Sequence, residues 1–208
     1  MKYVRLIAAV AAAASLSACA TVETATRNAP LVPEAVQPVS AALSIAAVNV
    51  TVPYSLRASE ANSYYPMGDI VWRGEPLADR HQQVKAIFED GLSKAAAKTQ
   101  GSVPVQVNIE VSRFHALTEK ARYTVGGRHE LQFTMFLSNP ETGQAYTKPR
   151  QIVTNIKAFG GARAIAAERN GITQRLRITD HIGEVVATEL AEAGAEIAAN
   201  SYVFASVE

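Results

Sequence analysis

The amino-acid sequence predicts an α+β fold, a two-layer sandwich in which two long helices cover one face of a four-stranded, mostly antiparallel sheet. Apolar and polar residues alternate in four short segments, and two longer segments repeat apolar residues at helical spacing. These elements follow one another as strand, helix, three-strand meander and helix. Alternation implies a sheet with one dry and one wet face, and two helices are enough to cover the dry face.

The strands are predicted from side chains that alternate along the chain. The first, at residues 44–53, has valine at every second position from 48 to 52, which places these valines on its dry face. The other three, at residues 103–112, 128–139 and 150–158, form the meander, and a turn containing proline and glycine joins the last two. We expect the first strand to return to this sheet through a helical crossover and therefore to pair in parallel with its neighbour.

Two long helices are predicted at residues 76–101 and from Thr173 towards the C-terminus, with a shorter one at residues 162–171. Gly101 follows the first long helix as a cap, and Thr173 is suited to the N-cap of the last. The buried faces are expected to hold Val84, Ile87, Phe88, Gly91, Leu92 and Ala95 in the first, and Leu176, Thr179, Ile182, Gly183, Val186, Leu190 and Ala193 in the last.

Residues 1–18 have the pattern of a signal peptide. Lys2 and Arg5 precede an apolar run of eleven residues, from 6 to 16, and no acidic residue occurs before Glu23. A helix needs about 20 apolar residues to cross a bilayer, so this run is too short for a membrane span. A short apolar run behind a basic start is typical of an export signal that is removed.

The residues at the predicted cleavage site, Leu16-Ser17-Ala18-Cys19, resemble the lipobox of bacterial lipoproteins. The resemblance implies cleavage between Ala18 and Cys19, and an N-terminal cysteine that carries fatty acyl chains such as palmitate. Cys19 is the one cysteine in the chain, so disulfide pairing does not explain it. The alternatives are an ordinary signal peptide with a chance cysteine, or a buried N-terminal helix. Because no aspartate follows Cys19, the resemblance favours the outer membrane.

Composition limits the remaining function classes. Without Lys2 and Arg5 the chain has 18 basic and 19 acidic residues, a net charge of −1, which argues against a nucleic-acid partner. Residues 19–40, with three prolines, are predicted to be a flexible tether, and residues 41–208 a single domain. The four histidines lack the i, i+4 spacing of a helical metal pair, and no nucleotide-binding or nucleophile motif is present, so we expect no cofactor and no metal.

The long connection at residues 53–76 is the leading candidate for a binding site. It has little periodicity beyond a short strand pattern at residues 69–73, and long connections in compact domains are often functional. Aromatic and arginine side chains are enriched at interfaces. The candidate binding residues are Tyr64, Tyr65, Asp69, Trp72, Arg73 and Glu75. The alternative is that the aromatic rings pack this loop on the sheet and that the charges form surface pairs.

Charged residues at the starts of the two long helices are weaker candidates. They are Arg80 and His81 in the first helix, and Arg175, Arg177 and His181 in the last. If the helices pack side by side in parallel, these groups could meet at one edge. The alternative is an ordinary solvated helix face.

Three stretches, "VPYSLRASEANSYYPMGDIVWRGEP", "ARYTVGGRHELQF" and "QRLRITDHIGEV", resemble an uncharacterised family of small alphaproteobacterial lipoproteins of unknown function. The resemblance covers most of the predicted domain and implies no activity and no site residues. At the level of fold alone, the order of elements also resembles the auxiliary lipoproteins of lipid-transporting ABC systems and the lipopolysaccharide-assembly lipoprotein.

These observations predict an outer-membrane-anchored, non-enzymatic accessory protein that faces the periplasm. Its contacts would be the membrane, through the N-terminal lipid, and an envelope protein or envelope lipid bound by residues 53–76. Two other functions stay open: an envelope hydrolase whose catalytic residues are dispersed in the sequence, and a purely structural lipoprotein.

Overall fold

The computed structural model describes residues 42–205, with side chains up to residue 198. The predicted signal peptide (1–18), Cys19 and the predicted tether (19–40) lie outside the described residues. No helix of the described part combines the length and the apolarity needed to cross a membrane.

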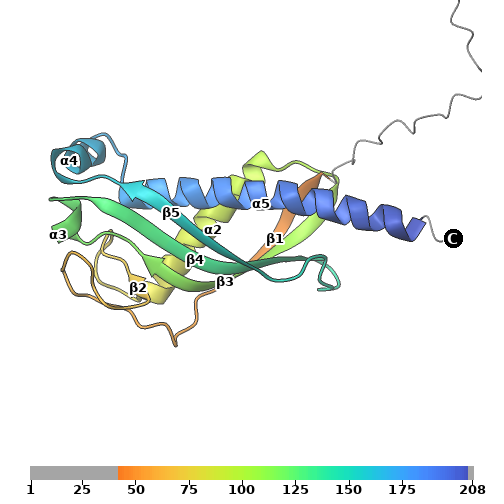
Figure 1. Cartoon of the computed structure of the whole chain (residues 1–208), viewed down its shortest axis with the longest axis horizontal. Coiled ribbons are helices and arrows are strands. Elements are labelled where there is room, and N and C mark those ends of the chain that lie inside the picture. Colours follow the sequence, from red (N-terminus) through yellow and green to blue (C-terminus); the bar gives the residue numbers. More distant parts are fainter. Residues whose placement is uncertain (1–41, 206–208) are drawn as a thin grey trace, which may run out of the picture. The chain divides into compact units, whose positions relative to one another are not determined.

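The described chain contains five strands and four helices, drawn in Figure 1. In chain order they are β1 (Leu43–Thr51), β2 (Ile70–Val71), α2 (Arg80–Lys98), β3 (Val103–His115), α3 (Glu119–Arg122), β4 (Gly127–Ser138), β5 (Arg150–Ala158), α4 (Gly161–Arg169) and α5 (Gln174–Ala205).

The strands form one mixed sheet with the order β1-β3-β4-β5. β3, β4 and β5 are the predicted antiparallel meander, and β1 pairs in parallel with β3 after the crossover through α2. The short strand β2 also pairs in parallel with β3, at Phe114 and His115, beyond the end of β1. The α+β sandwich is therefore confirmed, and β2 is a fifth strand added to the four that were predicted.

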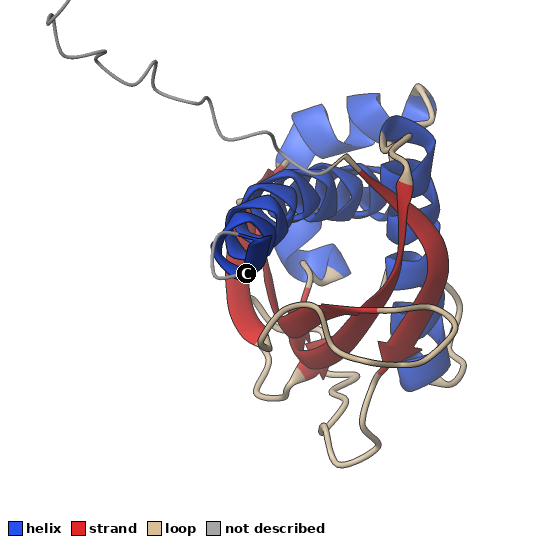
Figure 2. Ribbon diagram, turned by 90° about the vertical axis from the view of Figure 1, so that its right-hand side faces the viewer, coloured by secondary structure: helices blue, strands red, loops and turns tan. Residues whose placement is uncertain are grey.

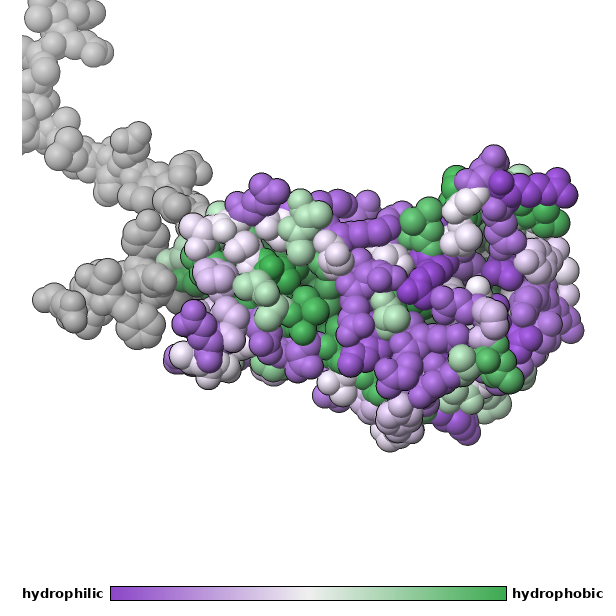
Figure 3. Space-filling view, turned by 180° about the vertical axis from the view of Figure 1, so that it is seen from behind, coloured by the Kyte–Doolittle hydropathy of each residue, from purple (hydrophilic) through white to green (hydrophobic). Residues whose placement is uncertain are grey.

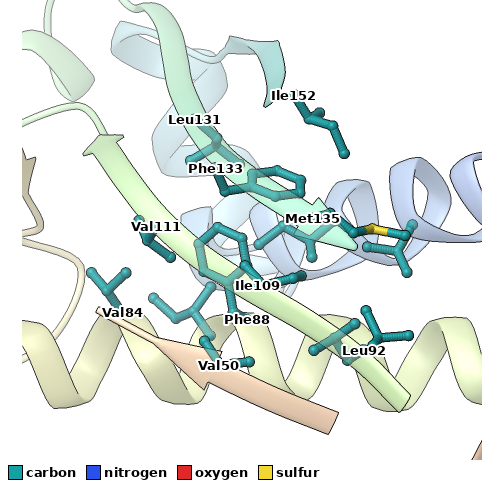
Figure 4. Packing of buried hydrophobic residues seen from close by; sticks show 14 of the residues in the cluster. Val50, Val84, Phe88, Leu92, Ile109, Val111, Leu131, Phe133, Met135 and Ile152 are labelled. Atoms are coloured by element: carbon teal, nitrogen blue, oxygen red, sulfur yellow. The ribbon is translucent and has the colours of Figure 1, made fainter. Parts of the chain in front are cut away.

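Helices α2 and α5 cover one face of the curved sheet (Figure 2). The core lies between these helices and the sheet. In it, Phe88 of α2 packs edge-to-face against Phe133 of β4, with 5.3 Å between the ring centroids. The close-up in Figure 4 shows side chains of β3, β4 and α2 pointing into this layer. The alternating residues Val105, Val107, Ile109 and Val111 of β3 are all buried there, as the sequence pattern predicts.

The two long helices touch at a pair of glycines. A Cβ on Gly91 would lie 2.5 Å from Cγ2 of Ile182, and a Cβ on Gly183 would lie 3.1 Å from the carbonyl oxygen of Gly91. The absence of side chains at these two positions lets the backbones approach closely. This contact positions the N-terminal turns of both helices, which carry the charged residues considered below.

Two predicted core positions are wrong. Leu176 is 39% exposed because it lies in the open groove between α2 and α5, and Ile178 is buried instead. Val48 is 43% exposed in β1, an edge strand with a single neighbour and a register shift between Ile45 and Ala47. In the view from behind, apolar residues gather towards the end of the domain where β1 begins (Figure 3).

Candidate functional site

Residues 53–76, here called the aromatic loop, fold back onto the sheet. Besides the pairing of β2 with β3, the Thr118 hydroxyl donates a 2.7 Å hydrogen bond to the carbonyl of Ser63. The Asn62 side chain accepts a 2.9 Å bond from the backbone N–H of Lys120. Since both contacts come from the start of α3, the loop is attached at its middle as well as at its two ends.

Trp72 packs the base of the aromatic loop. Its side chain is fully buried, meets Phe114 edge-to-face at 5.8 Å, and donates a 2.8 Å hydrogen bond from Nε1 to Glu75. Gly74 leaves room for the indole, since a Cβ there would lie 2.3 Å from the ring. A partner cannot touch Trp72 in this conformation, so this candidate binding residue belongs to the core and can affect a surface only by supporting it.

An ion-pair network holds the loop to α2 and α3. The buried Arg80 guanidinium donates to both carboxylate oxygens of Glu60, at 2.7 and 2.9 Å. Arg73 donates to Glu119 of α3 and to the backbone carbonyl of Glu60. The hydrogen bond from Arg80 is the main cause that lowers the pKa of Glu60 below its usual range. Bidentate arginine–carboxylate pairs are among the stronger and more directional contacts in proteins, so Arg73 and Arg80 fix the loop.

Arg175 connects the same loop to α5. Its guanidinium donates to Glu75 at 2.5 Å and to Asp90 of α2 at 2.6 Å. Glu75 therefore accepts hydrogen bonds from Trp72 and from Arg175, one from within the loop and one from the last helix. Of the weaker candidates, Arg80 and Arg175 thus act on the aromatic loop from two helices.

The outer end of the loop displays three large apolar side chains, here called the aromatic tip: Tyr64, Tyr65 and Met67. They are 53%, 61% and 83% exposed, respectively. The Tyr65 hydroxyl donates to Glu130 of β4 at 2.9 Å and accepts from Arg113 of β3 at 2.8 Å. Tyr65 is therefore exposed on one side and held in place at its polar end.

His115 and Lys120 contact the tyrosine rings of the tip. The His115 ring lies 4.5 Å from the Tyr65 ring, and its Nε2 donates to the carbonyl of Pro66 at 2.9 Å. Burial lowers the pKa of His115, which favours the neutral ring. The Lys120 ammonium lies 4.8 Å from the centre of the Tyr64 ring. Both tyrosine rings thus have fixed neighbours.

Asp69 and His81 have local structural roles. Asp69 accepts the backbone N–H of Arg57 at 2.8 Å, which joins two segments of the loop. His81 is held by the carbonyl of Leu56 at 2.9 Å, and its ring lies 4.6 Å from the Tyr54 ring. The N-cap of α2 is the neighbouring Asp79, which accepts the backbone N–H groups of residues 81 and 82.

Arg177 and His181 lie on another side of α5, away from the aromatic loop. Arg177 donates to the carbonyl of Lys157 at 2.6 Å, and His181 Nε2 lies 2.6 Å from the Thr154 hydroxyl. The charged residues at the helix starts therefore do not all meet at one edge. Residues two apart on a helix face different directions, so Arg175 reaches the loop while Arg177 reaches β5.

A histidine and a hydroxyl meet at His181 and Thr154, but no carboxylate of the described residues is hydrogen-bonded to the other ring nitrogen of His181. Burial lowers the pKa of His181. In the described part of the chain, no group of three or more His, Cys, Asp or Glu side chains has a geometry that could hold a metal ion.

Sequence reasoning missed the residues that support the aromatic tip: Met67 itself, together with Arg113, His115, Lys120 and Glu130. Met67 lies inside the candidate segment and has no aromatic or charged character to mark it. The others come from β3, α3 and β4, and only the pairing of β2 with β3 brings them to the loop. Local periodicity contains no signal for such contacts.

Among solved structures, the chain is similar to a protein of Caulobacter crescentus that is provisionally described as a lipoprotein, with 18% identity, 53% and 83% of the two chains covered, and a TM-score of 0.32. The chain is also similar to a Xanthomonas campestris protein described with the family DUF330. The identity is 12%, the match covers 80% of this chain and 89% of that one, and the TM-score is 0.43. An uncharacterised protein matches with 17% identity, 77% and 92% covered, and a TM-score of 0.32.

No curated protein matches the sequence. A family model described as a family of unknown function, DUF6778, matches residues 43–206, which is nearly the whole of the domain described above. The chain belongs to the DUF6778 family.

Proposed function

We propose that this protein is a non-enzymatic lipoprotein of the outer membrane that binds a partner protein in the periplasm through its aromatic tip. The proposal has two parts, an anchor at Cys19 and a binding surface at Tyr64, Tyr65 and Met67. They rest on different observations and are tested separately.

The anchor is supported by the sequence alone. A basic start, a short apolar run and Leu16-Ser17-Ala18-Cys19 form the complete pattern of a lipoprotein signal. More than one acyl chain is needed for stable membrane attachment, and the triacylated cysteine that the lipobox implies exceeds this requirement.

The binding surface is supported by one observation above all: exposed aromatic and methionine side chains stand on a loop that the rest of the domain holds rigid. Tyr65 is fixed at its hydroxyl by Glu130 and Arg113, and the loop beneath it is fixed by the bidentate pair of Arg80 with Glu60. A surface that is already ordered loses little conformational entropy on binding. Tyrosine and arginine are also enriched among the residues that dominate protein–protein affinity.

The position of the tip favours a partner over the protein's own membrane. In Figure 1 the aromatic loop lies at the end of the domain near α3 and α4, whereas β1 begins and α5 ends at the opposite end. The described chain therefore begins far from the tip, which supports a tip that is accessible to a partner.

Photocrosslinking in intact cells tests the binding surface. A photoreactive phenylalanine analogue replaces Met67, and a matched control places it at Val153, an apolar residue of β5 that is 60% exposed. We expect a discrete adduct with one protein at position 67 and none at position 153. The double change Tyr64→Ala and Tyr65→Ala should abolish the adduct, whereas Tyr64→Phe should keep it. Equal adducts at both positions, or an adduct that survives the double change, would show that the tip is not the binding surface.

Metabolic labelling with palmitate tests the anchor. We expect label in the wild-type protein and none in the Cys19→Ser variant, which should also remain unprocessed. Palmitate on the Cys19→Ser protein would refute the anchor and leave the proposed binding surface untouched.

A further inference from the structure

Two arginines and a phenylalanine form a cationic cluster at the junction of β5, α4 and α5. The proposed function does not involve these residues. The Arg177 guanidinium lies 3.9 Å from the centre of the Phe159 ring, and the Arg163 guanidinium lies 4.2 Å from the same ring. Phe159, Arg163 and Arg177 are here called the arginine corner. Two like charges are thus placed on one half-buried aromatic ring.

Neither of these arginines has an ion pair with any residue from 42 to 198. Other arginines nearby are paired, as Arg122 is with Glu168 at 3.2 Å. Arg177 donates one N–H to the carbonyl of Lys157. Burial, and then the charge of Arg163, lower the pKa of Arg177. Two adjacent cations are unfavourable unless a negative charge joins them.

A buried donor faces the same corner. A small cavity of about 20 Å³ adjoins the ring, and its charged and aromatic lining residues are Arg122, His129, Phe159, Glu168 and Arg177. His129 is 1% exposed, and its Nδ1 accepts the backbone N–H of Leu117 at 3.3 Å. The proton of the neutral ring is therefore on Nε2.

Helix α4 adds backbone donors beside the cluster. It begins two residues after Phe159, and Gly160 at its N-cap offers no side-chain acceptor to the first N–H groups. The N-terminus of a helix favours negative charge. This feature agrees with the two arginines and the histidine in the sign of the ligand that they would accept.

We propose that the arginine corner binds a phosphate group. Guanidinium groups bind phosphate oxygens in a bidentate manner, and they are less strongly hydrated than ammonium groups. A phosphate that contacts both Arg163 and Arg177 replaces their mutual repulsion by two attractions. The phosphate belongs either to a soluble anion or to the headgroup of an anionic lipid, and both present the same oxygens to the arginines.

Isothermal titration calorimetry with inorganic phosphate tests the soluble source, using the full chain with Cys19→Ser so that no acyl chain interferes. Binding is measured against chloride at the same ionic strength. We expect Arg163→Gln to weaken phosphate binding at least tenfold. Arg169→Gln is the matched control, because Arg169 is exposed on the same helix and makes no ion pair with a described residue; it should bind as the parent does.

Vesicles test the lipid source with the same variants. Flotation with phosphatidylcholine vesicles that contain phosphatidylglycerol, and with phosphatidylcholine alone, should show a dependence on Arg163 if a headgroup is the ligand. Loss on Arg163→Gln but not on Arg169→Gln, in either assay, supports the site and identifies its source. If phosphate and vesicles bind the Arg163→Gln and parent chains equally, or bind neither, the proposal is overturned.

Discussion

His129 is the residue whose chemistry the fold changes most. Burial, and then the charges of Arg177 and Arg122, lower the pKa of its imidazole from 6.5 to about 3. The ring is therefore neutral throughout the physiological range, as a hydrogen-bond acceptor for Leu117 requires. In the unfolded chain the same ring titrates near 6.5, so protonation favours the unfolded state.

Stability should fall as the pH falls from about 6.5 towards 3. In this window the unfolded chain binds a proton at His129 that the folded protein does not, and the free energy of unfolding decreases by about 1.4 kcal/mol per pH unit. Burial also lowers the pKa of His115 and His181, which act in the same direction. Urea denaturation at pH 7, 6, 5 and 4 measures the slope. His129→Asn keeps an acceptor for Leu117 and does not titrate, so its slope should be shallower, and equal slopes would contradict this account.

The tyrosines and Trp72 show how far residue type goes as a predictor. All were candidates because interfaces favour aromatic residues, yet Tyr64 and Tyr65 are exposed while Trp72 is fully buried. All three side chains are aromatic, and their positions relative to β2 decide the difference in exposure. Trp72 follows directly after Val71, which pairs with His115 of β3, so its side chain enters the layer between sheet and helix.

At the scale of elements, the crossing of α2 and α5 decides which charged residues meet. Gly91 and Gly183 bring the two backbones together, and this contact places Arg175 against Glu75 and Asp90. One turn further along α2, Lys94 pairs with Asp180. The aromatic loop is therefore attached to α5 only because the helices approach closely enough for Arg175 to reach it.

Gly91→Ala should destabilise the protein although alanine favours a helix. Alanine has a helix propensity better than glycine by about 1 kcal/mol, but its Cβ would lie 2.5 and 2.8 Å from branched atoms of Ile182 that cannot swing away. Overpacking of this kind costs about 1–3 kcal/mol, so we expect a net loss of up to about 2 kcal/mol in thermal or urea unfolding. Ser93→Ala, at an exposed position of the same helix, is the control and should change stability by less than about 0.5 kcal/mol. A gain in stability with Gly91→Ala would mean that the helices separate more easily than this contact implies.

At the scale of the whole domain, chain entry and candidate surfaces lie at opposite ends. α5 has 32 residues, or about 48 Å of helix. It starts beside α4 and the arginine corner, and it ends near the start of β1 (Figure 1). The aromatic tip is also at the α4 end, so both proposed surfaces are far from the point where the chain enters.

If Cys19 is acylated, the tip should lie farther from the bilayer than β1 does. The predicted tether of about 21 residues has a typical reach of roughly 25 Å, which is less than the length of α5. A fluorophore on Met67→Cys in the lipidated chain should be quenched less by headgroup-labelled vesicles than one on Val48→Cys. Stronger quenching at position 67 would instead place the tip on the protein's own membrane.

The sequence by itself determined the type and order of the main elements, because periodicity is a local property that burial on one face imposes. The valines on the buried face of β3, the buried face of α2 and the meander were all predicted from periodicity. The loop that carries the candidate tip was predicted because it lacks such periodicity. The tertiary structure alone decided that Trp72 is buried, that Arg175 and Arg177 separate, and that Phe159, Arg163 and Arg177 converge. These outcomes depend on contacts between residues far apart in the chain, for which a single sequence has no periodic signal, and they follow from strand pairing and from the closeness of two helices at Gly91 and Gly183.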